Sequence, residues 1–186
     1  MAPLHALVLA DEAPYVPLEQ LLTEHRVDVV VALGDLTREE LAPLRHFDGR
    51  KLGVHGNHDT GDEFDDAGIE DVHLKAVDLD GRTVGGFSGS HRYRGAGRFA
   101  WTQEESVAAL RDFGRVDILL AHSPPLGVND DTGDAAHEGL VGLRDYVGRT
   151  RPSLVLHGHT YPALQLRRLG RTVVRHVRGH ALVILP

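Results

Sequence analysis

Residues 51–59 read KLGVHGNHD, an apolar run that ends in glycine, asparagine, histidine and aspartate. The apolar part is typical of a buried β-strand. Asn57 and His58, side by side at the end of a strand, have little structural use, whereas both residue types can carry chemistry. Because α/β folds place their functional groups at the carboxyl ends of strands, the stretch indicates an α/β fold with a site at one sheet edge.

Four other apolar runs end in a similar way: HALVLAD (5–11), VDVVVALGD (27–35), VDILLAHSPP (116–125) and SLVLHGH (153–159). If these strands lie side by side, their polar ends meet in one crevice. Carboxylates, an amide oxygen and imidazoles, with no thiolate, suit Mn²⁺, Fe or Zn²⁺ better than an all-oxygen Ca²⁺ cage. A single aspartate after a strand is usually a cap or turn residue, so the prediction of a metal site depends on all five strand ends together.

The remaining pattern alternates helices with strands and then changes to hairpins. Helices are expected after Pro17, over 38–45 with Thr37 as cap, from the Thr102–Glu105 capping box to about Phe113, and over 138–149. The stretch 75–90 predicts a hairpin around Asp80-Gly81. The segment from residue 163 predicts two or three antiparallel strands, with turns at Gly170-Arg171 and Gly179. This order favours an α/β protein with mixed sheets.

Composition sets broad limits on the fold and on the function. The chain has 186 residues, of which 41% are hydrophobic, so we expect a single domain over 1–186. The absence of cysteine excludes disulfides, thiolate metal sites and cysteine nucleophiles. The net charge of -7 disfavours general affinity for nucleic acid but leaves room for a local basic patch. No leader or membrane-spanning run is visible, which predicts a soluble cytoplasmic protein.

At these strand ends the chain resembles the calcineurin-like metallophosphoesterases, whose pattern runs D-x-H, G-D, G-N-H-[DE], H and G-H-x-H. The matches are DEA (11–13), GD (34–35), GNHD (56–59), His122 in AHSPP, and GHTY (158–161). The resemblance covers nearly the whole chain and is closest to the compact branch of the family. It implies a four-layer αββα sandwich, in which helices flank two mixed β-sheets, and metal-dependent hydrolysis of phosphoesters.

The resemblance also implies a ligand set with a gap in it. Asp35, Asn57, His122 and His159 match the complete ligand set of one metal ion. The other ion keeps Asp11 and a share of Asp35, because Ala13 and Tyr161 stand where the family has histidines. We therefore expect one tightly held divalent metal and a second, weaker one. Whether Glu12, Tyr161 or another residue replaces the missing ligands stays open at this point.

The same resemblance suggests roles for further residues. His58 matches the histidine that protonates the leaving oxygen or stabilises charge beside it, and Asp59 is expected to orient it. The candidate substrate-binding residues are His91, Arg92, Arg94, His157 and Tyr161. Strand alternation places His157 on the same face as His159. His176 and His180 are weaker candidates, and the histidines treated as ordinary are His5, His25, His46, His55, His73 and His137.

The function expected from these residues is metal-dependent hydrolysis of a small phosphoester, with a phosphodiester or nucleotide as the preferred substrate. Mn²⁺ or Fe is the preferred cofactor, with Zn²⁺ or Mg²⁺ as alternatives. A second hypothesis is a degenerate domain that binds metal or nucleotide with little turnover. A third is a nuclease, which the arginines at 167, 168, 171, 175 and 178 suggest and the overall acidity disfavours. No membrane partner is expected, and the oligomeric state is left open.

Overall fold

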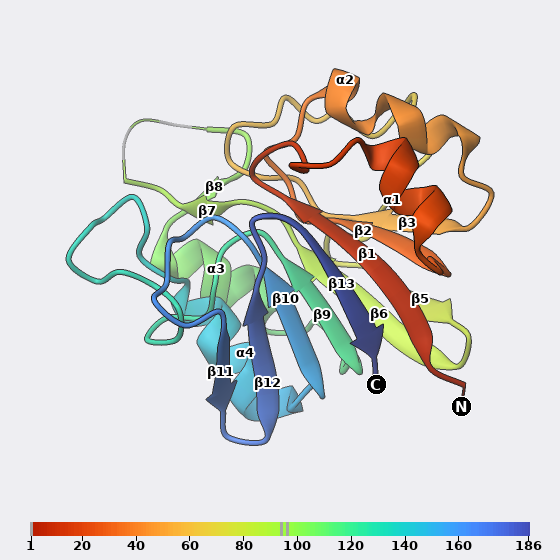
Figure 1. The fold of residues 1–186 in the computed structure, drawn as a ribbon. Coiled ribbons are helices and arrows are strands. Elements are labelled where there is room, and N and C mark those ends of the chain that lie inside the picture. The colour runs from red at the N-terminus through yellow and green to blue at the C-terminus, as the bar shows by residue number, and fades with distance from the viewer. Residues whose placement is uncertain (1, 94, 96) are drawn as a thin grey trace.

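The computed structural model describes residues 2–93, 95 and 97–186, and Figure 1 shows how their strands form two main sheets. The first sheet has the order β13-β1-β2-β3-β4. Its strands are β1 (Leu4–Ala10), β2 (Val29–Ala32), β3 (Arg50–Gly53), β4 (Glu70–Asp71) and β13 (Gly179–Leu185). β1 to β4 are parallel, and β13 pairs antiparallel with β1 at one edge.

The second sheet has the order β11-β12-β10-β9-β6-β5. Its strands are β5 (Ala76–Leu79), β6 (Arg82–Phe87), β9 (Ile118–Ala121), β10 (Leu154–His157), β11 (Leu166–Leu169) and β12 (Thr172–His176). The four central strands are parallel, and β5 and β11 are antiparallel edges. A small third sheet joins β7 (Ser90–His91) and β8 (Ala100–Trp101).

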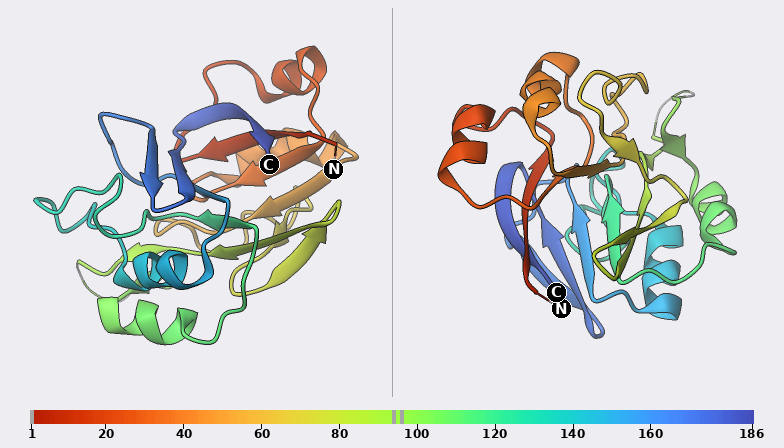
Figure 2. Two further views of the ribbon diagram at one scale, coloured as in Figure 1. Left: turned by 90° about the horizontal axis from the view of Figure 1, so that it is seen from below. Right: turned by 90° about the vertical axis from the view of Figure 1, so that its right-hand side faces the viewer.

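Helices cover the outer faces of both sheets, giving the four-layer αββα sandwich visible in Figure 2. The helices are α1 (Leu18–Glu24), α2 (Arg38–Leu41), α3 (Gln103–Leu110) and α4 (Val141–Thr150), with a 3₁₀ turn, η1 (Ala42–His46). α1 and η1 pack on the first sheet over a cluster that includes Leu7 and Val30. α3 and α4 pack on the second sheet over Leu119 and Val155. The predicted fold class is confirmed.

The core between the sheets explains why the strand sequences are apolar throughout. Val8 and Val31 from one sheet, and Leu120 and Leu156 from the other, meet in this layer and are almost fully buried. All four residues of β2, β9 and β10 are buried, because a central parallel strand is covered on both faces. The same parallel order brings the carboxyl ends of β1, β2 and β3 to one edge, and those of β9 and β10 to the matching edge of the second sheet.

Several local predictions are confirmed by side-chain contacts. Thr37 and Thr102 each form a capping box, with Glu40 and Glu105 respectively. Asp80 and Gly81 both have positive φ and connect β5 to β6 as a tight hairpin. Among the residues that the structure describes, no helix has the length and apolar character needed to cross a membrane.

Two predicted helix ends and one predicted strand pairing were wrong. The helix expected over 38–45 stops at Leu41 and continues as η1, which has Pro43 in its first turn. The helix after Thr102 ends at Leu110. β12 and β13 do not form a hairpin: β12 lies beside β10, and β13 lies beside β1 in the other sheet. Gly179, with φ 66°, stands where the chain enters β13.

Candidate metal centre

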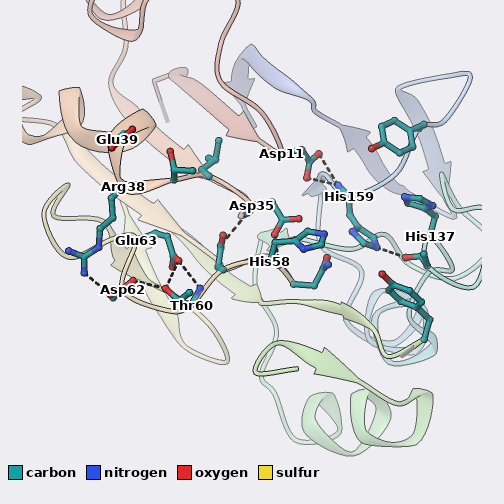
Figure 3. A pocket seen from close by; sticks show the side chains of 17 residues that line it. Asp11, Asp35, Arg38, Glu39, His58, Thr60, Asp62, Glu63, His137 and His159 are labelled. Carbon is teal, nitrogen blue, oxygen red and sulfur yellow. Dashed lines mark hydrogen bonds and ion pairs between the residues drawn. The ribbon is translucent and has the colours of Figure 1, made fainter. Parts of the chain in front are cut away.

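A cavity of ≈ 1010 Å³ opens where the carboxyl ends of the strands converge, and Figure 3 shows the side chains that line it. Asp11 follows β1 directly, and Asp35 comes three residues after β2. Asn57 lies in the loop after β3, and His159 lies two residues beyond β10. The loops after four different strands therefore contribute polar side chains to one cavity.

The tightest cluster joins Asp35, Asn57 and His122. His122 Nε2 lies 3.0 Å from Asn57 Oδ1 and 3.4 Å from Asp35 Oδ2. One ligand atom each from Asp35, His122 and His159 lies within 4.8 Å of the others. These residues come from three strand ends, and Asn57 comes from a fourth. The structure thus brings together all four residues of the predicted tight site.

The hydrogen-bonding of His122 shows that this cluster fits a cation. Its Nδ1 lies 2.8 Å from Leu33 O, so Nδ1–H donates there and Nε2 carries the lone pair when the ring is neutral. That lone pair then faces two further acceptors, the oxygens of Asn57 and Asp35. Three acceptors can share one position only if a proton or a metal ion lies between them, and a carbonyl-anchored imidazole is typical of metal ligands.

His159 is oriented in a similar way. Its Nε2 lies 2.8 Å from the carbonyl oxygen of Ala136, which assigns the hydrogen to Nε2 and leaves the Nδ1 lone pair free to bind a metal. Its backbone N–H donates to both carboxylate oxygens of Asp11, at 3.0 and 2.9 Å. Asp11 therefore lines the cavity and also fixes the backbone of His159.

Three of the candidate ligands have backbone conformations that side chains other than glycine rarely adopt. φ is 65° at Asp11, 54° at Asp35 and 68° at His159. Such conformations cost roughly 1–3 kcal/mol each and are concentrated at functional sites. Here they turn the chain sharply at the strand end and aim each side chain back across the sheet edge.

Close backbone packing explains the glycines before Asp35 and Asn57. A Cβ at Gly34, where φ is 94°, would lie 2.1 Å from Gly56 N. A Cβ at Gly56 would lie 2.0 Å from Asp35 Oδ1. The two loops can carry Asp35 and Asn57 to the same point only because both glycines lack a side chain.

At Asp35 and His122, burial and nearby charges shift the pKa in opposite directions, and the charges have the larger effect. Burial opposes ionisation of Asp35, but the charge of His122 and hydrogen bonds outweigh it and lower the pKa of Asp35 to about 2. Burial also opposes the charged form of His122, but Asp35 and Asp11 raise its pKa to about 9. Burial raises the pKa of Asp11 to about 6 and lowers that of His159 to about 3. With a pKa of about 9, His122 itself carries the positive charge beside Asp35 at neutral pH, and a metal ion bound at Nε2 would take the place of its proton.

The described contacts give Asp59 backbone partners, whereas the sequence predicts that it orients His58. His58 is exposed, lines the cavity and donates its backbone N–H to Asp35 Oδ1 at 2.8 Å. The Asp59 carboxylate is 4% exposed and accepts from the backbone N–H groups of Gly56 (2.7 Å) and Asp35 (3.2 Å). Asp59 therefore orders the two ligand-bearing loops, and it forms no hydrogen bond with the His58 ring among the described residues.

The predicted substrate-binding residues separate into different places. Tyr161 lines the cavity, with its ring edge-on to His137 and beneath the guanidinium of Arg178. Arg92 does not line the cavity, because its guanidinium donates to Glu105 and to Ala100 O. His91 pairs with Glu138 at 3.0 Å and also stays outside the lining. Arg94 lies outside the described residues.

His157 is also displaced from its predicted role. It is fully buried, and its Nε2 lies 3.2 Å from the amide nitrogen of Asn129. Burial and the nearby His176 lower its pKa to about 3. A neutral His157 therefore supports the loop after β9 from behind the cavity. Glu12 is engaged as well, by Tyr15 and Arg178, and is not among the residues that line the cavity.

Two histidines treated as ordinary have defined places near the site. His137 lines the cavity, pairs with Asp134 at 2.6 Å and stacks at a tilt against His159. It does not directly follow a strand, because β9 ends 16 residues earlier, so the pattern of polar residues at strand ends does not identify it. His55 lies between the rings of Phe64 and Phe99, and its Nδ1 is 3.6 Å from Asp59 and 3.5 Å from Glu63.

Comparison with known proteins identifies relatives in sequence and in fold. The family model for the calcineurin-like phosphoesterases matches residues 12–163. The UPF0046 protein K07C11.7 of Caenorhabditis elegans is 29% identical in an alignment of 165 positions that covers 72% of this chain and 56% of that protein. The chain thus spans little more than half the length of that relative.

Solved structures of low sequence identity share the fold. One superposes with a TM-score of 0.72 at 15% identity, over 98% of this chain and 95% of its own. The protein TT1561 of Thermus thermophilus gives 0.63 at 16% identity, over 94% and 89% of the two chains. Vacuolar Protein Sorting 29 from Cryptosporidium parvum gives 0.50 at 14% identity, over 94% and 73%.

Proposed function

The chain belongs to the calcineurin-like phosphoesterase family, and from this premise we propose that it hydrolyses small phosphodiesters or nucleotides with one tightly bound divalent metal ion. The family supports metal-dependent phosphoester hydrolysis in general. The observation that carries the finer proposal is the approach of two oxygens, Asn57 Oδ1 and Asp35 Oδ2, to His122 Nε2, beside the cavity. Asp35, Asn57, His122 and His159 would hold the ion, for which we favour Mn²⁺ or Fe.

We propose a centre with only one complete metal site because of the residues that surround the position of the second ion. Ala13 is exposed and lies outside the cavity lining. Tyr161 packs against His137 and Arg178, and Glu12 is paired elsewhere. Asp11 already accepts two contacts from the backbone of His159. A second ion would therefore have few additional side-chain ligands among the described residues, and we expect it to bind weakly.

The residues around the proposed metal position can contact different parts of a bound phosphoester. A divalent cation held there supplies the Lewis acidity that phosphoester hydrolysis requires. His58, exposed beside Asp35, is placed to contact a phosphoryl or leaving-group oxygen. Tyr161 and His137 form an aromatic wall on the other side of the cavity, which suits a substrate with a flat ring.

Hydrolysis of bis(p-nitrophenyl) phosphate in the presence of Mn²⁺ tests the proposal. The wild-type chain should release nitrophenolate, and His122→Ala should abolish the release because it removes a ligand. His58→Ala should lower kcat by about 10²- to 10⁴-fold and leave Mn²⁺ affinity unchanged. His25→Ala, an exposed change outside the cavity, serves as the control.

A second candidate is a domain that binds metal or nucleotide with little turnover. The loss of histidines at positions 13 and 161 and the engagement of Asp11 favour it. If the same experiment shows tight Mn²⁺ binding without hydrolysis of monoester or diester substrates, and His58→Ala changes nothing, this second candidate replaces the first.

A further inference from the structure

Four arginines line a second cavity, of ≈ 620 Å³, far from the metal centre. They are Arg115, Arg149, Arg151 and Arg171, and the remaining lining residue is Thr150. Arg115 precedes β9 by three residues, Arg151 precedes β10 by three residues, and Arg171 directly precedes β12. The metal ligands follow the other ends of β9 and β10, so the arginine cavity lies at the opposite end of the same parallel strands. In Figure 1 the β11–β12 turn marks this end, at the bottom of the view.

The charges of these arginines are not neutralised within the part of the chain that the structure describes. Among the described residues, no ion pair with a carboxylate is found for any of the four, although Arg26, Arg38, Arg50, Arg92 and Arg178 all have one. The ends of α3 and α4 contribute partial negative charge, about half an elementary charge each. Four guanidinium groups exceed that sum by roughly three charges. All four arginines are exposed, so an anion can reach them from solvent, and this concentration of positive charge on a chain of net charge -7 would attract an anion of several charges.

Part of this cavity is held in a fixed geometry. Arg149 Nη2 donates to Leu110 O at 2.8 Å, and its guanidinium lies 5.4 Å from the centre of the Tyr146 ring. Arg151 is the C-cap of α4, with φ 53°, an unusual conformation for a residue with a side chain. A smaller cavity of ≈ 430 Å³ shares Arg151 and Arg171 and adds apolar lining from Val147 and Leu169.

From these observations we propose that the arginine cavity binds a chain of two or more phosphate groups, at a site separate from the metal centre. One guanidinium group can donate two parallel hydrogen bonds to phosphate oxygens. Four guanidinium groups around one cavity match the way negative charge is spread along a polyphosphate. Both inorganic polyphosphate and a nucleoside di- or triphosphate carry this chemistry. The apolar lining of the adjoining smaller cavity would add affinity only for the nucleoside form.

Calorimetric titration of the full chain with sodium tripolyphosphate tests the proposal. The protein is first stripped of metal on a chelating resin, so that the carboxylate-rich centre offers no cation to the probe. We expect one bound equivalent, with affinity that falls as salt rises. Arg151→Gln and Arg171→Gln should each weaken binding about tenfold or more. ATP binding more tightly than tripolyphosphate would identify the nucleoside form, and equal affinity the inorganic form.

Matched variants distinguish this site from general positive charge and from the metal centre. Arg167→Gln removes an equal charge from β11, in the same hairpin as Arg171, but outside the cavity, and should leave the affinity unchanged. Asp35→Asn should also leave it unchanged. The proposal is overturned if tripolyphosphate does not bind, if Arg167→Gln weakens binding as much as Arg171→Gln, or if a DNA or RNA duplex binds at the cavity over tenfold more tightly than tripolyphosphate.

Discussion

At the residue scale, the buried carboxylate of Asp59 shows how the G-N-H-D motif works in this chain. It accepts from the N–H groups of Asp35 and Gly56, which lie in the loops after two different strands. A short-range reading of the motif assigns Asp59 to its neighbour His58, but the hydrogen bonds assign it to the backbone. Its contribution to the metal site is therefore to hold ligands in register rather than to contact substrate.

Replacement of Asp59 by alanine should separate these two roles. Asp59→Ala leaves two backbone N–H groups without their acceptor, at about 1–3 kcal/mol each if they stay buried. Loss of this support should weaken Mn²⁺ binding by about 10- to 100-fold. Calorimetric titration with Mn²⁺ measures the loss of affinity. Asp59→Asn retains an acceptor oxygen and should therefore keep much of the wild-type Mn²⁺ affinity. Unchanged Mn²⁺ affinity in Asp59→Ala would show that Asp59 does not order the ligands.

A second residue-scale prediction concerns His73, far from the candidate ligands in sequence. Its Nδ1 accepts from Ser88 N at 3.0 Å, and burial lowers its pKa from 6.5. The folded state therefore favours the neutral ring, and this contribution to stability is complete above about pH 6.5. It is lost as the pH falls below 6.5 towards the lower pKa of the folded state, because the unfolded chain then binds more protons.

Denaturant unfolding of His73→Asn, at pH 8 and at pH 5.5, tests this assignment. Asparagine keeps an acceptor and cannot gain a proton, so the variant should lose less stability between the two pH values than the wild type. His25→Asn, at an exposed position, should behave as the wild type does. A wild-type pH dependence in His73→Asn would refute the role of His73.

At the element scale, the strand ends are brought together by glycine-mediated contact between loops. The sequence predicts each strand of this cluster and the polar residue that follows it, because apolar runs and strand-end residues are local signals. The sequence does not predict the packing of Gly34 against Gly56, or the position of His137, because both depend on loops that meet only in the folded chain. The same limit explains the error at β13, since a local hairpin signal cannot show that a strand changes sheet.

Gly34→Ala is the sharpest test of this loop packing. The new Cβ would meet Gly56 N at 2.1 Å, at a φ of 94°, so the variant should lose about 2–5 kcal/mol of unfolding free energy, together with Mn²⁺ affinity. Gly148→Ala is the matched control: its Cβ meets nothing within 4 Å inside α4, and it should gain about 0.5–1 kcal/mol. Equal stability of Gly34→Ala and wild type, measured by urea unfolding, would contradict the packing.

At the scale of the whole molecule, the parallel strands place two sites of opposite charge at their two ends. The carboxyl ends carry the acidic candidate metal centre, and the amino ends of β9, β10 and β12 border the arginine cavity. Family membership and the αββα sandwich follow from the order of motifs along the chain. The sequence does not predict the arginine cavity, because its four arginines belong to different parts of the chain and share no motif. They are Arg115, Arg149, Arg151 and Arg171.

The central claim is that Asp35, Asn57, His122 and His159 close around one metal ion. A crystal structure of the Mn²⁺-soaked protein, with anomalous scattering to locate and quantify manganese, tests it most directly. We predict one fully occupied manganese position in contact with these four side chains, and at most a weak second peak beside Asp11. Two fully occupied positions, or a peak elsewhere, such as between His55, Asp59 and Glu63, would contradict the account.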